Sequence, residues 1–117
     1  KEKKKFGKKS QIEGDIKYND KVLLVEDLIT DGSSKYNFIE AVEEVGGRIK
    51  AIFVIFNYGI NKEFLEYNGK KIKIISLAKW EDVLKILKLK NIFPQKEISS
   101  IVKFLSSMGI KNLKSFL

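Results

Sequence analysis

The stretch VLLVEDLITDGSS, residues 22–34, decides the fold of this 117-residue chain. Its continuous apolar run, residues 22–25, is typical of a β-strand that is covered on both faces. The run ends in two acids, Glu26 and Asp27, and a polar stretch with one glycine follows. A polar, glycine-containing stretch after an apolar strand predicts a tight turn at residues 30–34.

Strands and helices alternate along the rest of the sequence. A helix is expected directly after the turn, because four apolar residues between positions 38 and 45 share one face and Gly46-Gly47 ends it. Further strands are predicted at 49–56 and 72–77, amphipathic helices at 80–89 and 95–107, and a short helix at 61–67 before an Asn68-Gly69 turn. This alternation indicates an α/β fold, a parallel sheet with flanking helices. Ligands bind at the carboxyl ends of the strands in such folds, which is where residues 26–34 fall.

The composition limits the chemistry. With 44% hydrophobic and 11% aromatic residues the chain is globular, and no apolar run reaches the roughly 20 residues that span a bilayer. It contains neither Cys nor His, which excludes disulfides, thiolate metal sites, histidine-ligated zinc and imidazole catalysis. Any reaction must use carboxylates, hydroxyls, lysines, backbone amides or a hard cation. We expect a cytoplasmic protein without a membrane partner.

The net charge of +8 is unevenly distributed. Residues 1–9 hold six lysines against one glutamate, whereas the other 108 residues have a net charge of only +3. A basic segment is the starting point for one alternative function, a small nucleic-acid-binding domain. The chain has a single arginine, Arg48, and no aromatic residues interleaved with basic ones on one face. Nucleic acid is therefore not expected as a partner.

The turn at 30–34 is suited to an anion. Unpaired N–H groups at the start of a helix attract phosphate, and Gly32 allows a close backbone approach or a positive φ. Thr30, Ser33 and Ser34 add hydroxyl donors. The alternative is that one of these hydroxyls simply caps the helix. Both alternatives remain open from the turn alone.

The two acids favour a sugar phosphate. Carboxylates repel a neighbouring anion, so acids beside an anion site are expected only where they have another role. Two such roles are accepting hydrogen bonds from sugar hydroxyls and holding hydrated Mg²⁺. Glu26 and Asp27 beside a phosphate turn therefore suggest a ribose 5-phosphate site. The alternative is a pair of solvated acids at the start of a loop.

Residues 22–34 also resemble the phosphoribosyl-diphosphate-binding signature of the type I phosphoribosyltransferases, with four apolar residues, two acids, two apolar residues and a Thr/Gly/Ser loop. The resemblance implies that Glu26 and Asp27 contact the ribose 2′- and 3′-hydroxyls. It assigns the 5′-phosphate to Thr30, Asp31, Gly32, Ser33 and Ser34. Hypoxanthine-type enzymes have a second Asp at the position of Thr30. In having a threonine there, the sequence resembles the orotate phosphoribosyltransferases.

The leading segment KEKKKFGKKSQIEG, residues 1–14, is similar to the mobile catalytic loop of the orotate enzymes. The resemblance implies that Lys1 and Lys4 close over the diphosphate in a neighbouring subunit's site; a solvated basic tail is the alternative. Three features depart from the family pattern. The usual catalytic Arg would precede Lys1, Phe6 stands where some members have His, and residues 57–60 lack a base-contacting Arg.

The resemblance implies the transfer of a 5-phosphoribosyl group from phosphoribosyl diphosphate to orotate, with Lys1, Lys4 and Asp27 as catalytic residues. It further implies Mg²⁺ as cofactor, with no protein metal ligands, and a homodimer with shared sites. It covers only the second half of a typical member, so residues 1–117 are interpreted as the C-terminal part of one domain, which could be inactive alone. Another phosphoribosyltransferase, a non-catalytic relative and a fragment with a vestigial site are the remaining alternatives.

The aromatic residues are expected to be mainly structural. Trp80 opens a predicted helix, which favours a packing anchor over a base-stacking platform, and Phe38, Phe53, Phe56 and Phe104 are predicted to be core residues. Residues 57–60 follow a strand at the ligand-binding edge and could line the base pocket.

Overall fold

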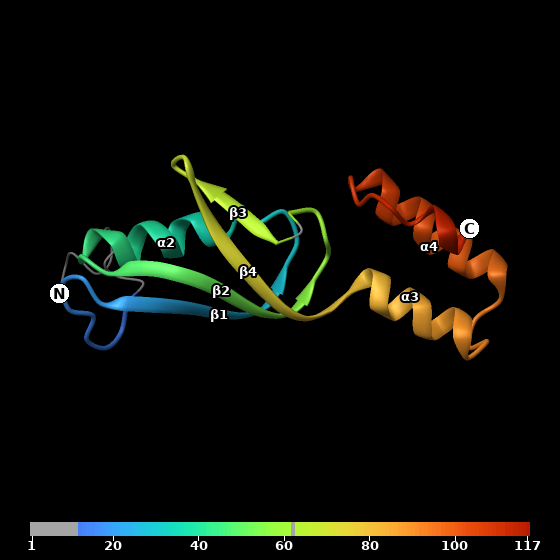
Figure 1. The fold of residues 1–117 in the computed structure, drawn as a ribbon, viewed down its shortest axis with the longest axis horizontal. Coiled ribbons are helices and arrows are strands. Elements are labelled where there is room, and N and C mark those ends of the chain that lie inside the picture. Colours follow the sequence, from blue (N-terminus) through green and yellow to red (C-terminus); the bar gives the residue numbers. More distant parts are fainter. Residues whose placement is uncertain (1–11, 62) are drawn as a thin grey trace. The chain divides into compact units, whose positions relative to one another are not determined.

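The computed structural model describes residues 12–61 and 63–117 (Figure 1). In chain order the elements are β1 (Lys21–Ile29), α2 (Lys35–Glu44), β2 (Arg48–Asn57), β3 (Phe64–Tyr67), β4 (Lys70–Lys79), α3 (Trp80–Leu89), α4 (Gln95–Ser107) and the 3-10 helix η2 (Lys114–Phe116). The strands form one sheet in the order β1-β2-β4-β3. The predicted α/β fold is confirmed, and so are the predicted helices at 80–89 and 95–107.

β1 and β2 run parallel. At their starts the Arg48 N–H donates to the Asp20 carbonyl (2.8 Å), and at their ends the Tyr58 N–H donates to the Ile29 carbonyl (3.0 Å). Like ends of the two strands are thus joined, as a strand–helix–strand unit requires. Figure 1 shows β4 running in the same direction. The carboxyl ends of these strands therefore lie at one edge of the sheet.

The predicted helix at 61–67 is wrong. The segment contains β3, which pairs antiparallel with β4 in a register that places Leu65 opposite Ile72 and Tyr67 opposite Lys70. The joining residues Asn68 and Gly69 have φ values of 48° and 76°. Positive φ at both positions is the type I′ pattern, which fits the twist of a hairpin. Seven residues before such a turn are too short for a stable helix but sufficient for a strand.

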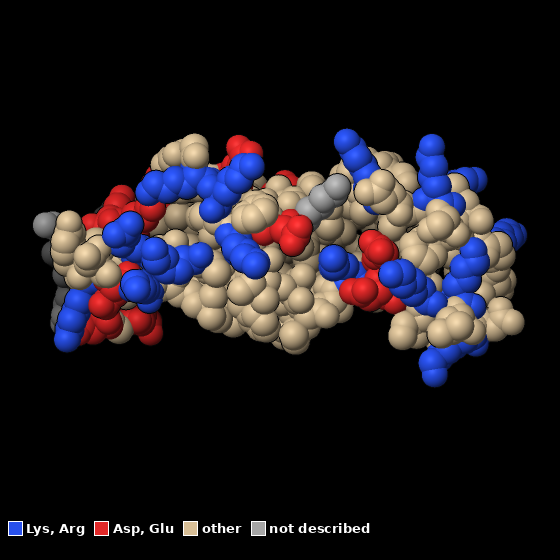
Figure 2. Space-filling model, in the orientation of Figure 1, with Lys and Arg blue, Asp and Glu red and all other residues tan. Residues whose placement is uncertain are grey.

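The strands are covered on one face only, so the prediction of coverage on both faces is wrong for the described residues. Ile52, Ile72 and Ile74 are buried, whereas Leu23 and Val25 of β1 are 52% and 60% exposed. Ile55, Ile75 and Leu77 continue this pattern on β2 and β4. Figure 2 shows an uncharged area over the strands. These exposed apolar residues lie on the sheet face that the described residues leave uncovered.

The chain divides into two compact units. The first contains the described residues up to Glu26 together with Gly32–Phe53 and Glu63–Ile75. Its core includes Ile39 and Ala41 of α2, which lie on the buried side of that helix.

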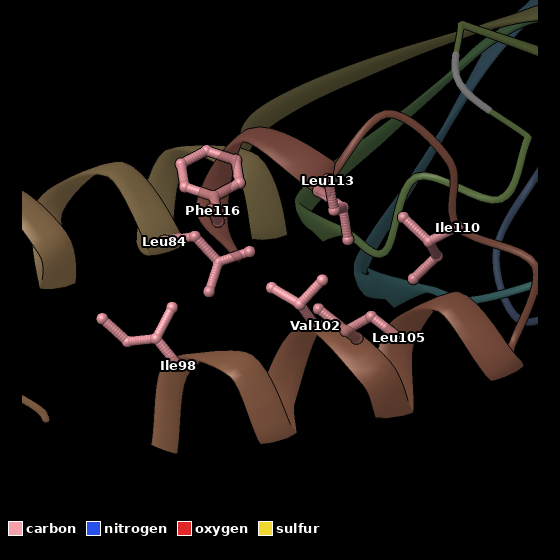
Figure 3. Close-up of a cluster of buried hydrophobic side chains, with 7 residues drawn as sticks. All are labelled: Leu84, Ile98, Val102, Leu105, Ile110, Leu113 and Phe116. Carbon is pink, nitrogen blue, oxygen red and sulfur yellow. The ribbon is translucent and has the colours of Figure 1, made fainter. Parts of the chain in front are cut away.

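The second unit contains Asp27–Asp31, Val54–Lys62 and Ser76–Leu117. Its helices α3, α4 and η2 pack around seven buried side chains (Figure 3): Leu84, Ile98, Val102, Leu105, Ile110, Leu113 and Phe116. Such a cluster is what the amphipathic patterns of 80–89 and 95–107 predict.

Trp80 acts as the predicted packing anchor. Its ring meets those of Phe56 and Tyr58 edge-on, with centroids 5.5 and 5.9 Å away, and it packs against the core of α3 and α4. The prediction for two phenylalanines is wrong, because Phe38 and Phe104 are 37% and 62% exposed. Both lie on helix positions next to buried residues, where helical spacing alone assigns the face poorly.

Candidate functional site

The acid pair lies inside β1 rather than after it, since the strand continues to Ile29. Glu26 is partly buried and Asp27 is exposed. Consecutive side chains of a strand point to opposite faces, which accounts for this difference. The two carboxylates therefore have different surroundings although they are neighbours in the sequence.

The turn between β1 and α2 is tight and contains a glycine in the left-handed region. Gly32 is buried with a φ of 88°, a conformation that costs an L-residue about 1–2 kcal/mol. Its carbonyl accepts from the Lys35 N–H (3.0 Å), and the Ser33 carbonyl accepts from the Tyr36 N–H (3.3 Å). The chain thus turns back on itself before α2 begins.

Ser34 occupies the N-cap position of α2 but makes no side-chain capping hydrogen bond. The capping alternative therefore does not account for this hydroxyl. A serine at the mouth of such a turn retains the ability to donate to an anion.

Residues of the next loop contact the turn. The side-chain amide of Asn61 donates to the Asp31 carbonyl. Nearby, buried Asn57 accepts from the Gly59 N–H through Oδ1 (2.8 Å), which shapes the loop after β2. The segment 57–61 therefore lies beside the carboxyl end of β1, and a base pocket lined by residues 57–60 stays a prediction. Sequence reasoning did not identify Asn61, because a loop asparagine carries no periodic signal.

A buried lysine, Lys35, contacts one of the two acids, and sequence reasoning did not identify it either. Lys35 is the first residue of α2, and its Nζ lies 2.7 Å from Oε1 of Glu26. Its side chain is only 5% exposed, and that of Glu26 is 30% exposed. The signal was present: Lys35, Ile39 and Val42 have the i, i+4, i+7 spacing of one buried helix face.

The other predicted residues are placed as follows. Thr30 is partly buried, and Asp31 and Ser33 are exposed. Lys1 and Lys4 lie outside the described residues. Across residues 12–61 and 63–117, no group of three or more His, Cys, Asp and Glu side chains could hold a metal ion. No helix in that part of the chain is long and apolar enough to cross a membrane.

Known proteins match nearly the whole chain, although no protein-family profile does. The orotate phosphoribosyltransferase of Roseobacter denitrificans is 39% identical over 103 residues, which cover 87% of this chain and 46% of that protein. The Rhizobium johnstonii enzyme of the same name is 35% identical over 107 residues, 92% of this chain and 46% of that protein. The chain spans about half the length of the curated relatives it matches.

A solved structure shares the fold. The match to Leishmania donovani UMP synthase covers 81% of this chain and 21% of the UMP synthase chain, with a TM-score of 0.68 and 22% sequence identity. At that identity the likeness shows the fold alone.

Together, the fold and the sequence matches confirm that the chain is a relative of the phosphoribosyltransferases. The particular relatives are orotate phosphoribosyltransferases, and the chain corresponds to a part of them, consistent with the predicted C-terminal portion.

Proposed function

We propose that this chain is part of an orotate phosphoribosyltransferase, which transfers the 5-phosphoribosyl group of phosphoribosyl diphosphate to orotate. The products are orotidine 5′-phosphate and diphosphate. The observation that carries the proposal is the match of 33–39% identity to orotate phosphoribosyltransferases over most of the chain. The strand, glycine turn and helix at residues 21–44 support it, because they supply the elements that a sugar phosphate requires.

The turn holds the 5′-phosphate. The hydroxyls of Thr30, Ser33 and Ser34 and the backbone of Asp31 and Gly32 surround the start of α2, where the helix dipole favours a negative charge. Anchoring the ligand at this end uses binding energy to position the reacting end of the sugar.

The acids bind the ribose. Glu26 and Asp27 accept hydrogen bonds from its hydroxyls, and the exposed carboxylate of Asp27 also lowers the energy of a ribose that becomes positively charged. In the displacement, the bond between C1 and the diphosphate oxygen breaks, and its electron pair leaves with the diphosphate. A nitrogen of orotate forms the new bond to C1, and the proton that this nitrogen carried is released to solvent. No residue of the protein needs to form a covalent intermediate.

The leaving diphosphate requires positive charge, which Lys1 and Lys4 would supply from a neighbouring subunit of a homodimer. Mg²⁺ would neutralise the same oxygens. We propose that Mg²⁺ would be held by the oxygens of the ligand and not by an acid cluster of the protein.

In a full-length relative, the half that this chain does not match would complete the site. The exposed apolar face of β1, with Leu23 and Val25, supports this view because a sheet of this class is normally covered on both faces. The first half of a full-length relative would bury that face and would supply a further loop that binds the diphosphate.

Fragment complementation tests the proposed function. The first half of the Roseobacter denitrificans enzyme is mixed with this chain, and orotidine 5′-phosphate is measured with orotate, phosphoribosyl diphosphate and Mg²⁺. We expect activity from the mixture and a loss of roughly 10²-fold in kcat/KM for Asp27→Asn, about 2.7 kcal/mol of transition-state stabilisation. The matched control is Asp20→Asn, at an exposed residue directly before β1. Equal activity of the Asp27→Asn and Asp20→Asn mixtures would remove the ribose role of Asp27.

A further inference from the structure

Lys35 is a buried charge without a role in the reaction described so far. Among the residues that the structure describes, Lys35 and Asn57 are the buried polar or charged ones. An ammonium group is costly to bury unless it is paired, and replacing a buried ion pair by apolar residues often leaves a fold equally stable. Stability alone is therefore a weak explanation for a lysine at this position.

The surroundings of Lys35 connect it to both parts of the proposed site. Its Nζ lies 2.7 Å from Oε1 of Glu26, which is a short, charge-assisted hydrogen bond. Its backbone N–H donates to the Gly32 carbonyl at 3.0 Å. One residue thus holds the acid through its side chain and the phosphate turn through its backbone.

We propose that Lys35 is a positioning residue for ribose recognition, acting through Glu26. This inference rests on the proposed function and names its ligand class, a 5-phosphorylated ribose. The ammonium fixes the orientation of the Glu26 carboxylate, so the carboxylate is already aimed when the sugar hydroxyls arrive. It also cancels the charge of Glu26, so that a phosphate dianion can bind in the adjacent turn without repulsion.

The two acids are thereby given different tasks. Glu26, which is paired with Lys35 and partly buried, recognises hydroxyls, whereas the exposed Asp27 stabilises the positive charge that develops on the sugar. A merely structural Lys35 would tie α2 to β1 and leave sugar selectivity unchanged.

Selectivity for hydroxyls is therefore the informative measurement. The probes are 1,4-anhydroribitol 5-phosphate and its 2,3-dideoxy analogue, which differ only in the two hydroxyls. Their affinities for the full 117-residue chain are measured by calorimetry, and the ratio of the two dissociation constants is compared between variants. Any general effect of charge or stability on phosphate binding cancels in this ratio.

For the wild type we expect a ratio of about tenfold or more, as the loss of hydrogen bonds to a charged group predicts. Lys35→Met, which keeps the length of the side chain but removes the charge, should reduce the ratio at least fivefold. Lys21→Met, an exposed lysine of the same strand as Glu26, is the control for net charge and should leave the ratio unchanged. In a Glu26→Gln background, Lys35→Met should have no further effect on the ratio.

The outcomes separate the two proposals. A wild-type ratio that Lys35→Met retains overturns the role of Lys35 and leaves the proposed function intact. A wild-type chain that binds neither probe, or both equally, overturns both. Additive effects of Glu26→Gln and Lys35→Met would show that Lys35 does not act through Glu26. If the circular dichroism spectrum shows that Lys35→Met does not fold, Lys35→Gln takes its place. Glutamine keeps a hydrogen-bond donor but removes the charge, and the same ratio of dissociation constants is measured.

Discussion

Substituting Gly32 with alanine should separate the strain in the turn from its binding role. Gly32 is buried with a φ of 88°, and alanine pays about 1–2 kcal/mol to adopt the left-handed conformation. If the turn backbone instead moves out of that conformation, the N–H groups proposed to face the phosphate are redirected. Loss of one hydrogen bond to a charged group is worth about 1.5–3 kcal/mol, or roughly ten- to a hundredfold in affinity.

Gly69→Ala is the matched control. Gly69 also has a positive φ, 76°, and a Cβ there would meet nothing within 4 Å, so its substitution introduces strain without a clash. Urea unfolding should show a similar loss of about 1–2 kcal/mol for both variants. Calorimetric titration with ribose 5-phosphate should show weaker binding for Gly32→Ala alone. Equal affinities of the two variants would refute the phosphate role of the turn.

Further predictions concern the two units. In the α3–α4 core, Leu105→Ala should lower the unfolding free energy by about 2–5 kcal/mol, since Leu105 is 0% exposed, whereas Phe104→Ala, with Phe104 62% exposed, should cost less than about 1 kcal/mol. The fluorescence of the single tryptophan, Trp80, reports the unfolding, and equal losses would contradict the assigned core. Burial and then the charge of Glu43 raise the pKa of Tyr67 above its ordinary value, so the folded state holds this proton more tightly and loses stability as the pH rises above about 10. Ultraviolet titration should show that the Tyr67 phenol ionises at a higher pH in the folded protein than in the unfolded protein. Glu43→Gln should shift the pKa of Tyr67 towards its ordinary value, and an unchanged titration would contradict the contribution of Glu43.

Much of the fold was predictable because local patterns and tertiary structure agree. The helices at 80–89 and 95–107 have apolar positions at helical spacing, and each starts and ends where the sequence indicates. β3 was not predicted, since a four-residue strand has too few positions to show a period of two. The Asn68-Gly69 pair, a strong hairpin signal, was the better guide.

The site was predictable in its backbone and less so in its contacts. The strand, the acids, the glycine turn and the helix follow one another along the sequence, so their order could be predicted from local patterns. The Lys35–Glu26 pair joins residues nine positions apart on different elements, and Asn61 reaches Asp31 across thirty positions. Such contacts depend on how elements pack, which periodicity does not specify.

The most direct measurement is a calorimetric titration of the chain with phosphoribosyl diphosphate and Mg²⁺, for the wild type and for Asp27→Asn. We expect saturable binding by the wild type and an affinity at least tenfold lower for Asp27→Asn, since a carboxylate that accepts hydroxyl hydrogen bonds is lost. Equal affinities of the two proteins, or no binding by the wild type, would contradict a phosphoribosyl site at residues 26–34.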